Sequence, residues 1–249
     1  MLTGSCPKME FDPAFVEEAV FWAARDTREA DNTLIQHFHN DRERIYQNAA
    51  EEDRNVSFQR LYGEYFEKLG IKDMFERVVV DFPLLNQPGI LIFFKKVWSK
   101  RDEDTELYVD GPSKTVCLAL TVNRILQPAG LQAILRHELL RISDMLDPRF
   151  QYVPHINLDG KDELEDNVIR DCFRILWDAY IDIRLGKKGH SVMKPAEERK
   201  KELQRAVFFF KKSEQEYIYS RLEGCEDLTQ IDLIGWAQDA RSTKTPGPC

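Results

Sequence analysis

Residues 131–147, LQAILRHELLRISDMLD, restrict the fold more than any other stretch of the chain, because they place charged groups within an apolar helix pattern. Their apolar residues recur at helical spacing, and a glycine before the stretch and a proline after it mark its ends. At about 100° per residue, His137, Arg141 and Asp144 lie within roughly 60° of one another, whereas Glu138 turns toward the apolar side. One face of this helix therefore carries side chains that can do chemistry.

The four residues that begin at His137, His-Glu-Leu-Leu, match the frame of a helical zinc motif. In that motif two histidines at i and i+4 bind the metal, and the glutamate after the first histidine polarises a metal-bound water. In this chain the fifth position is Arg141. A guanidinium stays charged and offers no lone pair, so it cannot replace an imidazole as a metal ligand.

A second apolar helix is predicted over residues 168–185, and across its middle the only charged residues are Arg174, Asp178 and Asp182, spaced four apart. A helix that is apolar nearly all round is buried, so we expect this polar stripe to be buried as well. Buried carboxylates need a cation, a metal or several hydrogen-bond donors. An ion pair between Arg174 and Asp178 would be a purely structural explanation, but it leaves Asp182 without a partner.

The two helices together resemble the zincin metallopeptidases, and within them the gluzincins, over roughly residues 75–190. The resemblance rests on the motif at His137 and on the two aspartates of the second helix. It implies that His137 and Asp178 hold zinc and that Glu138 is the general base that activates the metal-bound water. It also implies that Asp182 or Asp144 hydrogen-bonds a metal ligand and so orients it. The family more often has glutamate at the position of Asp178.

Arg141 is where the chain departs from the family's pattern. A catalytic zinc normally has three protein ligands, so a retained metal would need a substitute ligand, for which His155 and His190 are the candidates. Without metal, the Arg141 cation would stand where the metal charge stood and would pair with a neighbouring carboxylate. Asp144 and Arg174 are the remaining charged residues that could support either arrangement from these two helices.

We therefore hypothesise a zincin-like protein with a degenerate HExxR motif that is weakly active or inactive as a hydrolase and acts as a binding or structural protein. Zinc is expected to be absent or weakly bound. The alternative is an active zinc-dependent peptidase that uses His137, Asp178 and a ligand outside the motif, with its substrate along an edge strand at residues 115–122. A third hypothesis treats the motif as accidental in an unrelated α+β protein.

The predicted fold class is α+β. A helical N-terminal layer over residues 1–75 precedes a zincin-like core over residues 76–190, in which a small, mostly antiparallel sheet leads into the two packed helices. Short β-rich runs between breakers indicate four strands. These strands are predicted at residues 77–82, 89–97, 106–110 and 115–122. Residues 191–249 form a helical C-terminal extension and tail, and we expect the three parts to make one compact unit.

In the C-terminal extension, Pro195 is predicted to open a long charged helix that ends near Glu223, and a shorter helix follows over residues 228–240. An aromatic insertion at residues 207–210 interrupts the polar surface of the long helix. It either packs back on the N-terminal helices or forms the face of a homodimer.

The composition narrows the range of partners. With 35 basic and 43 acidic residues the net charge is −8, and no basic tract could follow a phosphate backbone, so nucleic acid is not an expected partner. No stretch approaches 18 uncharged apolar residues, which argues against a membrane protein. The five cysteines are scattered without a CxxC pair, as in reduced cytoplasmic proteins. A cytoplasmic protein with a peptide or protein as its partner is the expectation.

Overall fold

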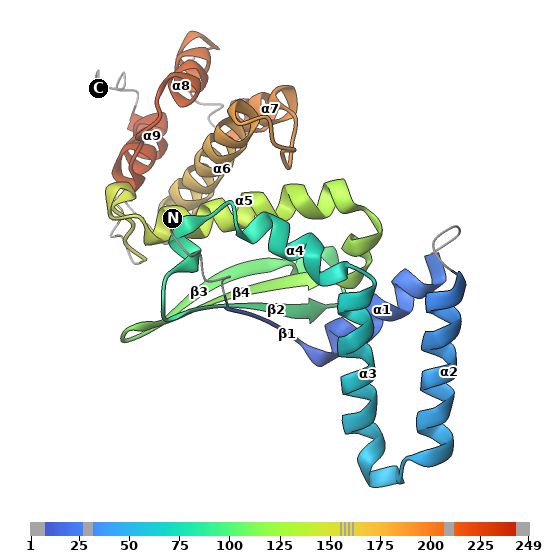
Figure 1. Cartoon of the computed structure of the whole chain (residues 1–249). Coiled ribbons are helices and arrows are strands. Elements are labelled where there is room, and N and C mark those ends of the chain that lie inside the picture. Colours follow the sequence, from blue (N-terminus) through green and yellow to red (C-terminus); the bar gives the residue numbers. More distant parts are fainter. Residues whose placement is uncertain are drawn as a thin grey trace, which may run out of the picture. The chain divides into compact units, whose positions relative to one another are not determined.

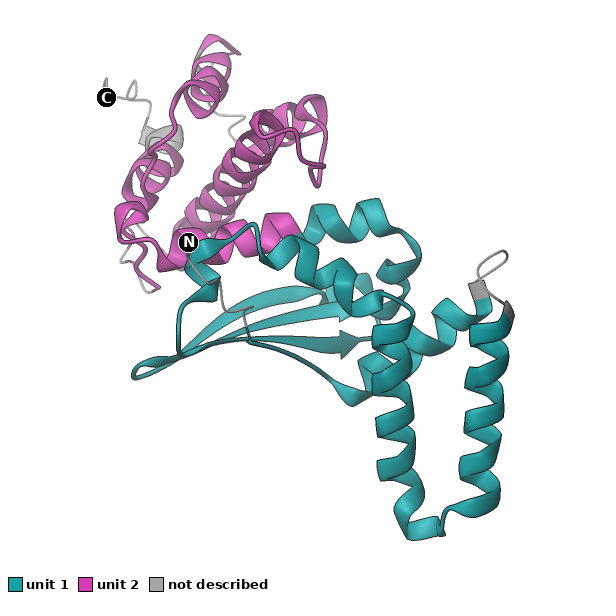
Figure 2. Ribbon diagram, in the orientation of Figure 1, with its two compact units in different colours: residues 1–135 teal, residues 136–249 magenta. Residues whose placement is uncertain are grey.

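The computed structural model describes residues 8–26, 32–154, 156, 158, 160, 162–206 and 212–242. These residues form nine α-helices and four β-strands, so the fold is α+β, as predicted (Figure 1). The chain divides into two compact units, residues 1–135 and 136–249 (Figure 2). The division falls within helix α5, Pro128–Leu146, and so within the core predicted for residues 76–190.

The sheet belongs to the first unit and has the strand order β1-β2-β4-β3. Strand β2 pairs in parallel with both β1 and β4, and only the β3–β4 pair is antiparallel. The prediction of a mostly antiparallel sheet is therefore wrong. Gly111, with φ of 55°, allows the tight turn that makes β3 and β4 antiparallel neighbours. The bounds are Lys8–Phe11 for β1, Ile90–Val97 for β2, Asp104–Asp110 for β3 and Ser113–Thr121 for β4.

Three predicted strands are confirmed with small shifts of their ends, as β2, β3 and β4. The prediction of an edge strand at residues 115–122 is wrong, because β4 lies between β2 and β3, and the edges of the sheet are β1 and β3. Strand β1 lies in the segment that we assigned to a helical layer. Its four residues are too few to give a period-2 pattern.

The strand predicted at residues 77–82 is also wrong, since Ile71–Val79 is helix α4. Gly70, at φ of 68°, separates this helix from the preceding one. Ile71, Phe75, Val78 and Val79 recur at helical spacing and are all buried. Packing of this helical face outweighs the β propensity of three consecutive valines.

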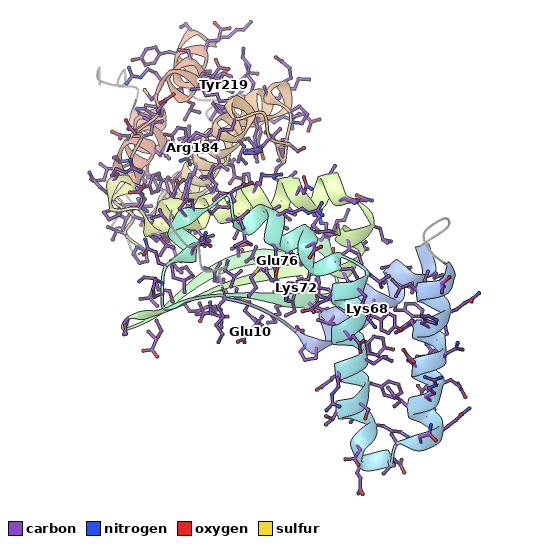
Figure 3. The ribbon with its side chains drawn as sticks, in the orientation of Figure 1. Glu10, Lys68, Lys72, Glu76, Arg184 and Tyr219 are labelled. Carbon is purple, nitrogen blue, oxygen red and sulfur yellow. The ribbon has the colours of Figure 1, made fainter. Side chains whose placement is uncertain are left out.

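The other helices of the first unit are α1 (Pro13–Asp26), α2 (Asn32–Asn48) and α3 (Arg54–Lys68). Helices α2 and α3 run side by side in opposite directions, joined through a short 3-10 turn, and α1 packs against α3 (Figure 1). A core of phenylalanine rings ties strands to helices, because Phe94 of β2 stacks on Phe11 of β1 at 4.8 Å between centroids and meets Phe75 of α4 at 4.7 Å. On the exposed side of the sheet, Glu10 of β1 pairs with Lys8 at 2.9 Å (Figure 3).

The second unit is helical, and α7, α8 and α9 each pack against the long helix α6 or against one another. Its core gathers large apolar residues of α6, α8 and α9, among them Leu176, Tyr180, Leu222 and Leu233. The apolar stripe of α8 is thus buried within this unit. The bounds are Glu163–Lys187 for α6, Ala196–Ala206 for α7, Lys212–Gly224 for α8 and Gln230–Ser242 for α9.

The long helix predicted from Pro195 to about Glu223 corresponds to two described helices, α7 and α8, whereas the predicted closing helix is confirmed as α9. The aromatic insertion at residues 207–210 lies outside the described residues. Within the part of the chain that the structure describes, no helix has the length and apolar character needed to cross a membrane.

Candidate functional site

Helices α5 and α6 supply the carboxylates and the imidazole of the candidate site, all within the second unit. Helix α6 begins at an Asp162 cap, whose side chain accepts a hydrogen bond from the Glu165 backbone N–H at 2.8 Å. Most side chains in the second half of α6 are apolar, and Asp182 is buried among them with 4% of its side chain exposed. A carboxylate in this position needs strong partners, and the structure supplies them from three elements.

Arg141 bridges the two helices. Its guanidinium donates from Nη1 to Glu138 Oε2 at 2.9 Å and from Nη2 to Asp178 Oδ1 at 2.5 Å. The side chains of Glu138, Arg141 and Asp178 are 14, 18 and 20% exposed, so the bridge is largely withdrawn from water. The guanidinium carbon also lies 6.0 Å from the centre of the Trp177 ring. Removal of this cation would take the closest cation away from both carboxylates.

His137 contacts Glu138 of this bridge, and its side chain is only 3% exposed. Its Nδ1 is 3.2 Å from Glu138 Oε1, and its Nε2 is 3.4 Å from Arg199 Nη2. A guanidinium can only donate, so Nε2 acts as the acceptor in this contact, and the ring hydrogen is placed on Nδ1, facing the glutamate. The lone pair with which His137 would bind a metal is therefore directed at Arg199.

Arg199, on α7, completes the site and is the functional residue that the sequence analysis missed. Its side chain is 4% exposed and donates from Nε to Asp182 Oδ2 at 2.6 Å, while its Nη1 is 3.6 Å from Asp178 Oδ2. Burial works to lower the pKa of Arg199, but the negative charges of Asp182 and Asp178 outweigh it and hold the pKa above its ordinary value. Arg199 is thus a permanent cation at the centre of the unit.

Asp182 also fixes the chain that follows α6. Its two oxygens accept hydrogen bonds from the backbone N–H groups of Met193 at 3.0 Å and Lys194 at 3.3 Å. Arg199 in turn donates to Glu202 at 2.8 Å, and Lys194 donates to the other oxygen of Glu202 at 2.7 Å. Burial works to raise the pKa of Glu202, yet these two cations outweigh it and lower the pKa.

We name this arrangement the guanidinium cluster. It comprises His137, Glu138, Arg141, Asp178, Asp182 and Arg199. His137 Nε2 lies 3.9 Å from one oxygen of Asp178 and 3.9 Å from one oxygen of Asp182. The structure therefore brings together the imidazole and both carboxylates that the sequence singles out on these helices, with two guanidinium groups between them.

The residues of the cluster do not fit a zinc ion. Zinc needs converging lone pairs at about 2.0–2.2 Å, whereas the nitrogen nearest to His137 Nε2 belongs to a guanidinium that has no lone pair to give. Arg141 fills the position of the second motif histidine and engages Asp178. Among the described residues no group of three or more histidine, cysteine, aspartate or glutamate side chains could hold a metal.

Asp144 belongs to a separate ion pair. It accepts hydrogen bonds from Trp177 Nε1 at 2.8 Å and from Arg184 Nη1 at 2.8 Å. The Arg184 guanidinium also lies over the Tyr180 ring, 4.1 Å from its centre. Asp144 is buried as a partner of α6, and its contacts do not include the cluster's imidazole.

The prediction of a buried polar stripe on α6 is wrong at Arg174. This side chain is 70% exposed and pairs with Asp171 at 3.3 Å, not with Asp178. Four residues advance a helix by slightly more than one turn, so a stripe at i, i+4, i+8 drifts around the helix, and here its first member reaches solvent.

Of the two candidate substitute ligands, the structure describes only His190. His155 lies outside the described residues. His190 follows the end of α6, where its backbone N–H donates to the Leu185 carbonyl at 3.0 Å, and none of the described contacts joins its imidazole to His137 or Asp178.

Comparisons with known proteins gave no relative. No family model matches the chain, and no match was found among curated proteins or among solved structures. The geometry of the guanidinium cluster therefore has to support any functional conclusion by itself.

Proposed function

We propose that this chain is a zincin-related protein in which two guanidinium groups replace the catalytic metal, and that it acts as a non-hydrolytic binding or structural protein. The observation that supports this is the position of Arg141 and Arg199 among His137, Asp178 and Asp182. These are the side chains that the resemblance to gluzincins assigns to a metal and its surroundings.

Charge supports the replacement. A zinc ion would bring two positive charges to the carboxylates, and two guanidinium groups bring the same number in a form that needs no lone pairs. Each guanidinium reaches two carboxylates of the cluster: Arg141 contacts Glu138 and Asp178, and Arg199 contacts Asp182 and Asp178 in addition to Glu202 outside the cluster. The cluster therefore links helices α5, α6 and α7 without a metal. Exposed surface ion pairs contribute too little to stability to fulfil this role.

The state of Glu138 argues against hydrolysis. A general base needs a free lone pair directed at a nucleophilic water. Both Glu138 oxygens already have partners, with Oε1 3.2 Å from the His137 ring and Oε2 2.9 Å from Arg141. We therefore propose that the protein presents its surface to a peptide or protein partner. The buried ion pairs would keep helices α5, α6 and α7 in one arrangement for this purpose.

Metal analysis tests this proposal. The protein is purified without chelator and dialysed, zinc is measured per chain by mass spectrometry, and cleavage of an unstructured protein substrate is assayed alongside. We expect zinc far below one ion per chain and no cleavage above that of a Glu138→Gln control. About one zinc per chain after dialysis, with cleavage that Glu138→Gln abolishes, would overturn the proposal in favour of an active peptidase.

A further inference from the structure

A groove of about 450 Å³ lies in the first unit, between the start of α1 and the α2–α3 pair. Four aromatic rings line it, so we name it the aromatic groove; the rings belong to Phe11, Tyr46, Phe58 and Tyr62. Phe58 and Tyr62 are four residues apart on α3 and share a face of that helix, and Tyr46 approaches from α2. The groove lies in a different unit from the guanidinium cluster and is independent of it.

The rings form a curved wall. The Tyr46 and Phe58 ring centres are 4.9 Å apart with the planes at 58°, and those of Phe58 and Tyr62 are 6.4 Å apart with the planes at 39°. Tyr46 is 52% exposed, so its ring is held at a surface rather than in the core. Tyr46, Phe58 and Tyr62 therefore form a continuous aromatic lining of the groove.

Polar groups in the groove lack partners. The side-chain amides of Asn55 and Gln59 line it, and neither makes a hydrogen bond to any residue that the structure describes. Glu17 is the one charged residue among the described residues that line the groove, and the Arg42 side chain contacts Tyr62, one of the lining rings. Burial raises the pKa of Tyr62, the negative charge of Glu17 raises it further, and Arg42 lowers it through its charge and a side-chain hydrogen bond.

We propose that the aromatic groove binds a small quaternary ammonium compound of the choline class. Aromatic faces attract a cation through the ring quadrupole, and walls of several aromatic rings are suited to methylated ammonium groups. Glu17 adds a matching negative charge at the same groove. The volume lies within the range of about 300–1,000 Å³ that small-ligand pockets have.

Other ligand classes fit less well. An anion would meet no cation among the lining residues and would face Glu17. A purely apolar ligand would bury the Asn55 and Gln59 amides without partners, which costs free energy. A primary ammonium keeps three N–H donors that need acceptors, whereas a trimethylammonium group has none. The hydroxyl of a choline-like ligand can use one of the two amides.

The proposal is tested by calorimetric titration of the full chain with choline and with 3,3-dimethylbutan-1-ol, which has the same shape without the charge. We expect saturable binding of choline at one site. The neutral analogue should bind at least about twofold more weakly. Equal affinity for both compounds, or no saturable binding of choline, would overturn the proposal.

Variants of the lining residues test whether choline binds in the aromatic groove. Tyr46→Ala and Glu17→Gln should each weaken choline binding roughly two- to fivefold, whereas Tyr108→Ala, at a 55% exposed tyrosine of β3, is the matched control and should not change it. Gly63→Leu should abolish binding, because a Cβ at Gly63 meets no atom within 4 Å and the added side chain can fill the groove without disturbing α3. Unchanged affinity in a folded Gly63→Leu variant would contradict the assigned site.

A further titration distinguishes the two sources of a quaternary ammonium group, which are a free small molecule and a methylated protein. A short peptide that carries trimethyllysine is titrated in the same way and compared with choline. We expect the peptide to bind no more tightly than choline. Clearly tighter binding of the peptide would overturn the assignment to a small molecule and would point to a modified protein partner.

Discussion

The guanidinium cluster and the aromatic groove differ in how their polar groups are satisfied. In the cluster every carboxylate accepts a hydrogen bond from at least one guanidinium, and Asp182 also accepts two backbone N–H groups. In the groove two side-chain amides have no partner among the described residues. Saturated buried polar groups fix a conformation, whereas Asn55 and Gln59 are exposed, and their amides can exchange water for a ligand. We therefore propose a structural role for the first region and a binding role for the second.

The largest expected effect comes from removing Arg199. Arg199→Ala should destabilise the second unit by roughly 3–5 kcal/mol, because it leaves Asp182 as a buried charge without its cation and leaves Asp178 with Arg141 alone. Chemical denaturation followed by helical circular dichroism measures the change. Arg205→Ala, at an exposed position of the same helix, is the control and should stay within about 0.5 kcal/mol of the parent. A loss as small as the control's would remove the structural role that we assign to the cluster.

Coupling within the cluster gives the next largest effect. Asp182→Asn and Arg199→Ala should be strongly non-additive, with an interaction energy of about 1–3 kcal/mol, because each variant removes the other's principal partner at 2.6 Å. A double-mutant cycle measures it. Asp144→Asn combined with Arg199→Ala serves as the comparison, since Asp144 pairs with Arg184 instead, and we expect near-additive behaviour there. Additivity in both cycles would mean that Asp182 and Arg199 do not act as a pair.

Acid titration should reveal the outer part of the cluster. The folded-state pKa of Glu202 lies below its ordinary value near 4.5, so its stabilising contribution is fully present above that pH and is lost as pH falls through the folded pKa. At neutral pH, Glu202→Gln should therefore cost about 1 kcal/mol or less, since the pair with Lys194 is partly exposed. Below pH 4 the difference from the parent should shrink. A difference that grows toward low pH would contradict the sign of the shift.

The groove should give the smallest stability effects. Gly63→Leu is expected to be neutral or to stabilise by up to about 1 kcal/mol, because it replaces a glycine within a helix and its Cβ meets no neighbour. Thermal unfolding measures this without ligand. A marked destabilisation would mean that the groove is closed by packing, and the contrast with the cluster would then fail.

The periodic parts of the sequence predicted their elements well, and the long-range pairings were harder to foresee. Helices α5 and α6 follow from apolar residues at helical spacing, and β2, β3 and β4 follow from β-branched runs between breakers. Strands β2 and β4 are neighbours because β3, which lies between them in the sequence, pairs with the other side of β4. The residue pattern within each strand does not determine this order. Helix α4 was missed because a run of valines favours a strand until packing of Phe75 and Ile71 is taken into account.

The candidate site was predictable only in part. His137 and Asp178 stand out because charged residues are rare within apolar helices, and their side chains lie 3.9 Å apart. Arg199 was missed because it lies in the densely charged segment EERKKELQR, where any one arginine looks solvated. One signal was present: Leu203 follows Arg199 by four residues, so the two share a helical face, and both are buried. Partners on another helix decide which residue of such a face is buried, and a sequence alone does not give them.

The central claim is that guanidinium groups stand where a metal would bind, and the double variant Arg141→His/Arg199→Ala tests it most directly. The change restores an imidazole four residues after His137 and frees the lone pair that Arg199 now faces. Thermal unfolding is measured with and without zinc for the double variant and for the parent. Ligand that binds only the folded state raises the midpoint, by about 2.7 kcal/mol of stability at a hundredfold excess over Kd. We predict that zinc raises the melting temperature of the double variant and leaves that of the parent unchanged. A folded double variant that does not respond to zinc, or a parent that responds as strongly, would contradict the account.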